Sequence, residues 1–260
     1  MICNRNFPAS LRIGAFIMEK FRVGIIGATG MVGQRFVLLT ANHPWFTPVV
    51  LAASAHSAGK TYAQAIEGKW HMAEPIPESV KSMIVMDAEA DAEEIARQVD
   101  FVFCAVNMKK DEIKALEEKY AKLECPVVSN NSAHRHTPDV PMVVPEINAG
   151  DVKLHHGIIS NPNCSTIITL TAINALRKLS PIRDMVVSTY QAVSGAGAGG
   201  PIELQNEVDA LRAGKSYAPK VFAHQIAYNV IPQIGGEAYE GYTSEEMKMQ
   251  NEGRKIMHLP

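Results

Sequence analysis

Hydrophobic residues along this chain alternate between short continuous runs and stretches where they recur every three or four positions. The runs predict strands at 21–26, 48–53, 82–86, 101–105 and 126–129. A helix is expected to follow the segment 27–33 and to run to about residue 40, and the helical period predicts further helices over 92–98 and 109–123. Strands that alternate with helices in this way are typical of a parallel sheet covered on both faces, so the sequence predicts an α/β fold.

The pattern changes in the second half of the chain. An apolar-periodic stretch predicts a helix from 166 to 179, and 201–212 predicts another. Between them, 185–191 is rich in residues that favour strands. This half therefore predicts a smaller, mixed α+β domain.

Composition narrows the classes of partner and compartment. The formal net charge is −2, and no basic block or aromatic-basic interleaving suggests nucleic acid. The longest apolar runs are far too short for a membrane span. The cysteines (Cys3, Cys104, Cys125, Cys164) have neither paired spacing nor a zinc-type pattern with histidine. We expect a reducing, cytoplasmic setting, no structural disulfide and no metal.

A glycine-rich segment follows the first predicted strand and opens a helix. Gly27, Gly30 and Gly33 form a GxxGxxG pattern in the context that dinucleotide binding requires. Glycines there permit a tight turn and let a pyrophosphate approach the helix N-terminus. Because the spacing differs from GxGxxG, a glycine-rich turn that binds nothing is the alternative.

The second predicted strand lacks the acid that usually holds the ribose of NAD. No Asp or Glu lies between Glu19 and Glu67, and the strand runs into 53–60, which contains serines, a histidine and a lysine. Hydroxyl and basic groups suit a 2′-phosphate, so NADP is favoured over NAD. A polar surface loop is the alternative.

Cys164 lies where a loop turns into a helix. Pro162 disfavours helix before it, and Asn163 or Ser165 can cap the helix that follows. Unpaired N–H groups and the helix dipole at such a position favour a thiolate and can hold an oxyanion. A small buried cysteine at a helix start is the alternative.

Seven segments together resemble the aspartate-semialdehyde dehydrogenase family. They are residues 27–33 (GATGMVG), 53–60, 129–135 (SNNSAHR), 138–148, 161–166 (NPNCST), 188–197 and 242–248. The resemblance begins near Glu19 and implies a Rossmann-type domain over 19–146, a catalytic and dimerisation domain over 147–260, and an extension, expected to be disordered, at 1–18.

The resemblance implies reduction of L-aspartyl-4-phosphate to aspartate semialdehyde by NADPH in lysine, threonine and methionine biosynthesis. Cys164 would be the nucleophile that forms a thioester, and Gln191 would orient the substrate. The implied substrate-binding residues are Arg135, Asn163, Glu245 and Lys248. Of these, Arg135 would grip the phosphate, and Glu245 and Lys248 would share one face of a helix.

The resemblance also implies the cofactor site and an assembly. The predicted NADP-binding residues are Gly27, Thr29, Gly30, Met31, Val32, Ser54, Ser57, Ala105, Asn130, Ser194 and Gly195. A complete chain is expected to form a homodimer or homotetramer.

One departure from the family concerns the C-terminal part. The family's general-base histidine lies in an Arg-x-Pro-Val-x-x-x-His stretch that this sequence does not contain, and His258 stands in a different context. A C-terminally truncated chain with little turnover is therefore expected. Two alternatives remain: a non-catalytic remnant that binds NADP or a full-length subunit, and a sister enzyme such as N-acetyl-glutamyl-phosphate reductase.

Overall fold

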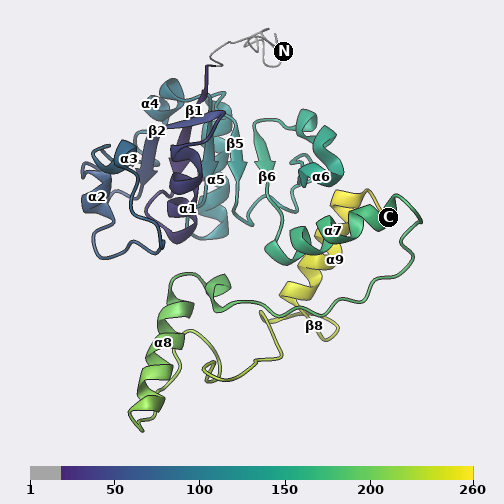
Figure 1. The fold of residues 1–260 in the computed structure, drawn as a ribbon. Helices are drawn as coiled ribbons and strands as arrows, with labels where there is room; N and C mark the ends of the chain where they lie inside the picture. The colour runs from purple at the N-terminus through teal and green to yellow at the C-terminus, as the bar shows by residue number, and fades with distance from the viewer. Residues whose placement is uncertain (1–18, 260) are drawn as a thin grey trace.

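A computed structural model of the chain describes residues 19–259. The extension predicted at 1–18, including Cys3, lies outside the described residues. In the described part, six parallel strands form one sheet in the order β3-β2-β1-β4-β5-β6 (Figure 1). The strands are β1 (Phe21–Ile26), β2 (Phe46–Ala53), β3 (Met86–Asp87), β4 (Phe101–Cys104), β5 (Val127–Ser129) and β6 (Ile158–Ser160).

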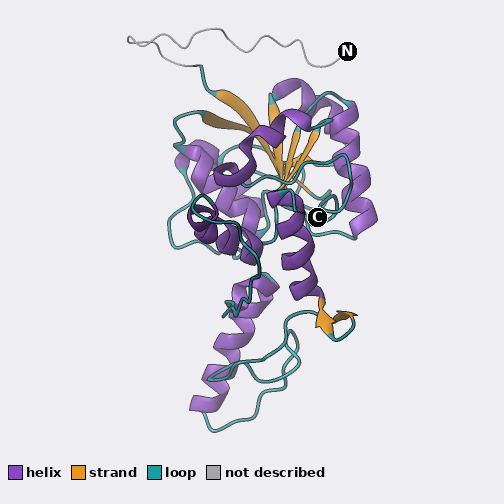
Figure 2. Ribbon diagram, turned by 90° about the vertical axis from the view of Figure 1, so that its right-hand side faces the viewer, coloured by secondary structure: helices purple, strands orange, loops and turns teal. Residues whose placement is uncertain are grey.

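Helices cover both faces of this sheet (Figure 2). Neighbouring strand residues point to opposite faces, so each strand feeds two cores. Ile25 and Leu51 pack with Val37 and Tyr62 on one face, whereas Ile26 and its neighbours pack with Ile95 and Leu116 on the other. The helices of this part are α1 (Met31–Ala41), α2 (Tyr62–Ala65), α3 (Glu78–Lys81), α4 (Ala92–Gln98) and α5 (Lys110–Lys122). The predicted α/β fold with a parallel sheet is confirmed.

The rest of the chain contains helices and one small hairpin. It comprises α6 (Pro145–Asn148), the 3-10 helix η1 (Ala149–Leu154), α7 (Cys164–Arg177), the 3-10 helix η2 (Val193–Ala196), α8 (Gly199–Arg212), the antiparallel pair β7 (Glu237–Tyr239) and β8 (Tyr242–Thr243), and α9 (Ser244–Met257). Helices α7 and α9 lie side by side, and α8 stands apart below the sheet (Figure 1). Leu170 of α7 and Ile256 of α9 share a third core with Met142 and Val144.

Two predicted strands differ in the structure. The prediction of a strand at 185–191 is wrong, since this segment has no regular secondary structure. The side chains of Val186 and Tyr190 are 98% and 90% exposed to solvent. Strand-forming residues need a hydrogen-bonding neighbour, and none pairs with them here among the described residues. The strand predicted at 82–86 is reduced to β3, and Ile84 forms an isolated bridge to Thr61.

The parallel sheet also extends beyond the domain boundary predicted near residue 147. β6 pairs with β5 in the same sheet, with Ile158 opposite Val127. α7 begins four residues after β6 ends, so the sheet itself delivers Cys164. No helix in residues 19–259 has the length and hydrophobicity to cross a membrane.

Candidate active site

Most of the predicted cofactor residues and the predicted nucleophile follow strands that end at one edge of the sheet. The carboxyl ends of parallel strands lie at the same edge, which is where ligands bind in such folds. The glycine loop follows β1, Ser54 and Ser57 follow β2, Ala105 follows β4, Asn130 follows β5, and Cys164 follows β6. The topology therefore brings together segments that lie more than 130 residues apart in the chain.

The glycine loop crosses from β1 to α1 in close contact with β4. Gly27 has φ +88°, and a Cβ there would lie 2.3 Å from the carbonyl oxygen of Ala105. A Cβ on Gly33 would lie 2.0 Å from the carbonyl oxygen of Gly27. The first turn of α1 has neither a side-chain cap nor an acidic residue, so its N–H groups face the edge without a protein acceptor at the cap. This is an anion-binding arrangement.

Cys164 is the first residue of α7, and its side chain is an exposed free thiol. Asn163 caps the helix, because its Oδ1 accepts hydrogen bonds from the N–H groups of Ser165 (2.9 Å) and Thr166 (3.3 Å). Ser165 Oγ lies 4.0 Å from the sulfur. The alternative of a buried cysteine is excluded for Cys164. In contrast, Cys104 is a buried core residue, as predicted.

Glu245, at the start of α9, joins the predicted substrate residues. Its Oε1 accepts from Asn163 Nδ2 (3.1 Å) and Gln191 Nε2 (3.2 Å), and its Oε2 pairs with Lys248 Nζ (3.2 Å). Burial by itself would raise the pKa of this carboxyl, but the hydrogen bonds from Gln191, Lys248 and Asn163 and the Lys248 charge outweigh burial and hold the pKa below its usual value. Glu245 is therefore a carboxylate at neutral pH.

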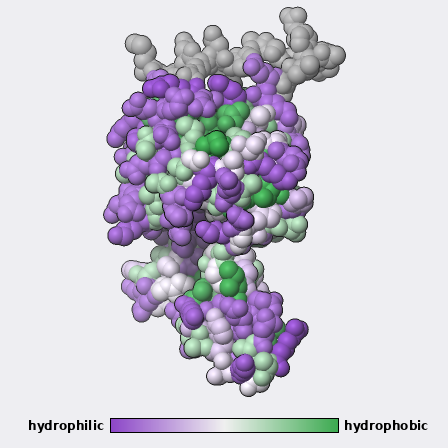
Figure 3. Space-filling model, turned by 90° about the vertical axis from the view of Figure 1, so that its left-hand side faces the viewer, coloured by the Kyte–Doolittle hydropathy of each residue, from purple (hydrophilic) through white to green (hydrophobic). Residues whose placement is uncertain are grey.

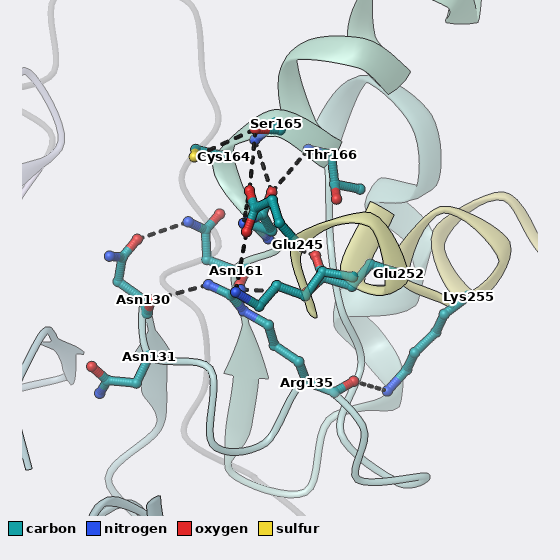
Figure 4. A network of polar contacts seen from close by, with 12 residues as sticks. Asn130, Asn131, Arg135, Asn161, Cys164, Ser165, Thr166, Glu245, Glu252 and Lys255 are labelled. Carbon is teal, nitrogen blue, oxygen red and sulfur yellow. Dashed lines mark hydrogen bonds and ion pairs between the residues drawn. The ribbon is translucent and has the colours of Figure 1, made fainter. Parts of the chain in front are cut away.

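Arg135 lies in the interior rather than open to a ligand. Its Nε donates to the carbonyl oxygen of Asn161 (3.0 Å), and its Nη1 pairs with Glu252 (3.3 Å). Its Nη2 lies 3.5 Å from the carbonyl oxygen of Asn130, and its side chain is 10% exposed (Figure 4). Phosphate binding by Arg135 stays a prediction, for which two of the five guanidinium N–H groups remain beyond these three contacts.

Asn130 connects the ends of two neighbouring strands. Its N–H donates to the carbonyl oxygen of Cys104 at the end of β4, and its Oδ1 accepts from Asn161 Nδ2 (2.8 Å). The residue predicted to bind cofactor is thus hydrogen-bonded to the segment that carries the nucleophile.

The remaining predicted cofactor residues form local turns. Thr29 accepts from Gln34 Nε2 through its carbonyl oxygen, and Met31 and Val32 form the first turn of α1. Ser57 donates its N–H to the carbonyl oxygen of Ser54. Ser194 and Gly195 lie in η2, with hydrogen bonds confined to 192–197, so contact with a nucleotide is a prediction for them.

The site holds no metal cluster. Across residues 19–259, no three His, Cys, Asp or Glu side chains are arranged to hold a metal ion. His258 lies outside the nucleophile's surroundings, and its Nε2 is 3.1 Å from Asp151 Oδ2.

Two residues of α9 that sequence reasoning missed also support the site. Glu252 is fully buried, and its Oε2 accepts from the N–H of Asn163 (2.6 Å). Lys255 Nζ donates to the carbonyl oxygens of Arg135, Thr137 and Val140 at 2.8–3.0 Å. Together with Glu245 and Lys248 they follow a spacing of three, four and three residues, which places all four on one face of a helix. That charged stripe was the signal in the sequence.

These features define a class of protein: a dinucleotide-binding α/β domain whose sheet edge also carries an exposed cysteine at a helix start. Residues 22–155 match the family described as the NAD-binding domain of semialdehyde dehydrogenases, and residues 173–260 match the family described as their dimerisation domain. The chain belongs to the semialdehyde dehydrogenase family.

Individual relatives agree with this assignment. An aspartate-semialdehyde dehydrogenase of Aquifex aeolicus is 41% identical over 244 residues, and one of Bacillus subtilis is 35% identical over 246 residues. Each alignment covers 92% of this chain and 66% of the relative, so the chain spans just under two thirds of their length.

Solved structures share the fold. The crystal structure of aspartate semialdehyde dehydrogenase II from Vibrio cholerae has a TM-score of 0.79 at 34% identity, covering 93% of this chain and 68% of that one. A Candida albicans enzyme solved with NADP has a TM-score of 0.68 at 28% identity, covering 92% of this chain and 60% of that one. The resemblance to aspartate-semialdehyde dehydrogenases is confirmed.

Proposed function

We propose that this chain carries the nucleotide site and the nucleophile of an NADP-dependent aspartate-semialdehyde dehydrogenase. The observation that carries the proposal is the exposed Cys164 at the capped start of α7, on the same sheet edge as the glycine loop. The names of the relatives supply aspartate semialdehyde. The family resemblance implies L-aspartyl-4-phosphate as the substrate from which this aldehyde is formed.

In this reaction the Cys164 thiolate attacks the acyl carbon of the substrate. The carbon–oxygen bond to phosphate breaks, inorganic phosphate leaves, and a thioester remains on Cys164. The N–H groups of Ser165 and Thr166 already donate to Asn163 Oδ1, so we expect the partial positive charge at the start of α7, rather than these two donors, to stabilise the developing oxyanion. After reduction of the thioester carbon, the carbon–sulfur bond breaks, the aldehyde departs, and Cys164 is again a thiolate.

Glu245, Lys248 and Gln191 are suited to hold the substrate. The Glu245 carboxylate can pair with the substrate ammonium, and Lys248, with a side chain 36% exposed, offers a positive charge to the phosphate. Gln191 and Asn163 both donate to Glu245, so the substrate-binding groups and the helix cap form one hydrogen-bonded unit.

The residues present fit a dinucleotide. A Cβ on Gly30 would touch only the carbonyl oxygen of Gly27, at 3.5 Å, which leaves the space above the uncapped turn of α1 for a pyrophosphate. Ser54, Ser57, His56 and Lys60 suit the 2′-phosphate that distinguishes NADP from NAD. When bound, the nicotinamide supplies the hydride.

The matched dimerisation domain supports an assembly of two or four copies. Residues 173–260 expose several large hydrophobic side chains, among them Leu176, Leu179, Val186 and Tyr190. On the face shown in Figure 3, hydrophobic residues also reach the surface in the lower part of the molecule. We infer that this part of the chain contributes to a subunit interface.

The test is the reverse reaction, with this chain and a Cys164→Ser control. Phosphate-dependent formation of NADPH from NADP and L-aspartate semialdehyde, lost in the control, supports the proposal. Absence of turnover while NADPH still binds would reject catalysis by this chain and leave a nucleotide-binding protein. Preference for N-acetyl-glutamate semialdehyde would identify the sister reductase instead.

A further inference from the structure

Helix α9 packs against α7 and forms hydrogen bonds with Asn163, the residue before Cys164. Its charged stripe contains two carboxylates seven residues apart, Glu245 and Glu252, which face the same side two turns from each other. Glu245 belongs to the proposed substrate site. Glu252 is fully buried, and α9 places it near Arg135 (Figure 4).

The Glu252 carboxylate joins two separate parts of the site. Its Oε2 accepts the main-chain N–H of Asn163 at 2.6 Å, and its Oε1 pairs with Arg135 Nη1 at 3.3 Å. A buried carboxylate needs partners for both oxygens, and here they come from 89 and 117 residues away. Each oxygen of Glu252 therefore already has a partner within the protein.

Asn163 is consequently held at two points by one helix. Glu252 holds its main-chain N–H, and Glu245 accepts from its side-chain amide, whose oxygen caps α7. These hydrogen bonds fix Asn163, and Asn163 in turn caps the first turn of α7, where the Cys164 thiol lies.

We propose that Glu252 is a positioning residue for the nucleophile: it orients the start of α7 through Asn163 and offsets the charge of Arg135 beside it. The chemistry that is positioned rests on the proposed function. Glu252 itself touches neither substrate nor cofactor in this scheme.

A purely structural ion pair is the competing explanation. Loss of either partner of a buried pair destabilises a protein, so a lower Tm fits both explanations. They differ in what Cys164 experiences. A positioning role changes the reactivity of the thiol and the local charge, whereas a structural role changes stability alone.

Alkylation of Cys164, followed by mass spectrometry of its peptide, separates the two without needing turnover. Neutral iodoacetamide and anionic iodoacetate are compared on the wild type and on Glu252→Gln. We expect the iodoacetamide rate to fall about tenfold or more, because the start of α7 is displaced. We expect the rate ratio of iodoacetate to iodoacetamide to rise about threefold, because Arg135 loses its counter-ion.

Two further variants make the experiment decisive. Glu252→Asp keeps the charge but is one methylene shorter, so its iodoacetamide rate should fall while the ratio stays that of the wild type. Glu207→Gln is the matched control, since Glu207 is a buried carboxylate on α8 that accepts two backbone N–H groups, from Ile226 and Ala227. Its Tm should fall with both alkylation rates unchanged.

Wild-type alkylation rates in both Glu252 variants would overturn the proposal. If Glu252→Gln does not fold, the rate in Glu252→Asp decides. If the wild type lacks turnover but the variants show the expected alkylation, the proposed function fails and the role of Glu252 stands. If the wild type is active, the proposal further requires a lower kcat in Glu252→Asp with an unchanged KM for NADP.

Discussion

The glycines Gly27, Gly30 and Gly33, which connect β1 to α1, serve different purposes. Gly27 and Gly33 leave no room for a Cβ, because backbone atoms lie 2.0–2.3 Å from where it would sit. At Gly30 the nearest such atom lies at 3.5 Å, an ordinary contact. Packing therefore requires the outer two glycines, and ligand approach is the reason left for the middle one.

This difference predicts opposite behaviour for two alanine variants. Gly33→Ala should lower the free energy of unfolding by about 3 kcal/mol or more, because the backbone must move. Gly30→Ala should keep the wild-type Tm but bind NADPH more weakly. Thermal unfolding and NADPH fluorescence titration measure the two effects. Equal loss of Tm in both variants would contradict this division of roles.

Individual residues also show how far sequence reasoning reached. The position of Cys164 and its cap followed from local signals, Pro162 and Asn163, and the structure has both where they were expected. Arg135 was assigned to phosphate from its motif, yet its guanidinium is paired with Glu252, 117 residues away. A local motif identifies a residue type and its neighbours in the chain, but not a partner that folding brings from a distant helix.

At the scale of elements, α8 fastens a loop through two buried carboxylates. Glu203 accepts N–H groups from Lys220, Val221 and Phe222, at 2.6–2.9 Å, and Glu207 holds the next stretch. Burial tends to raise the pKa of Glu203, but the three backbone donors outweigh it and lower the pKa below the usual 4.5. The position of residues 220–222 thus depends on the ionised carboxylate of Glu203.

The contribution of Glu203 to the stability of this segment should change with pH in a direction that can be measured. A lowered pKa in the folded state means that the contribution of Glu203 is complete above about pH 4.5, and is lost as the pH falls through the folded pKa. Hydrogen exchange of the 220–222 amides, relative to the unfolded chain, should therefore accelerate in acid.

A variant of Glu203 checks the cause. Glu203→Gln should accelerate exchange of the same amides already at pH 7, because an amide cannot accept all three bonds. Asp209→Asn removes an exposed charge from the same helix and should leave their exchange as in the wild type. Unchanged protection in Glu203→Gln would show that packing, rather than the carboxylate, holds the segment.

Elements were predicted well where a periodic pattern was long and poorly where pairing decided the outcome. Helices α4, α5, α7 and α8 lie within a few residues of their predicted ranges, since amphipathic patterns report burial directly. The strand expected at 185–191 did not form, because strand preference carries no information about a neighbour. β6 was missed for the complementary reason: three residues suffice when β5 lies beside them.

On the scale of the whole molecule, the exposed apolar residues of the 173–260 region predict self-association. Val186 and Tyr190 are 98% and 90% exposed, so replacing them removes no internal packing. Val186→Ser/Tyr190→Ser should weaken self-association about tenfold or more without lowering the Tm. Sedimentation equilibrium measures the change.

Leu39→Ser provides the control for this prediction. Leu39 is an exposed hydrophobic residue on α1, outside the matched dimerisation domain, and is 59% exposed. Its replacement should leave the association constant unchanged. An equal effect of both variants would indicate nonspecific aggregation rather than a defined interface.

The support that α9 gives to Asn163 and Arg135 has a consequence for how the protein is made. The contact from Asn163 to Glu252 spans 89 residues, and at about 5–20 residues per second their synthesis takes roughly 4 to 18 s. For most of that interval the ribosome holds a nascent chain whose sheet can close but in which neither Glu245 nor Glu252 has been synthesised to hold the loop before Cys164. The reactive thiol therefore reaches its final environment only after Glu252 has been synthesised, and translation sets the earliest moment at which it can act.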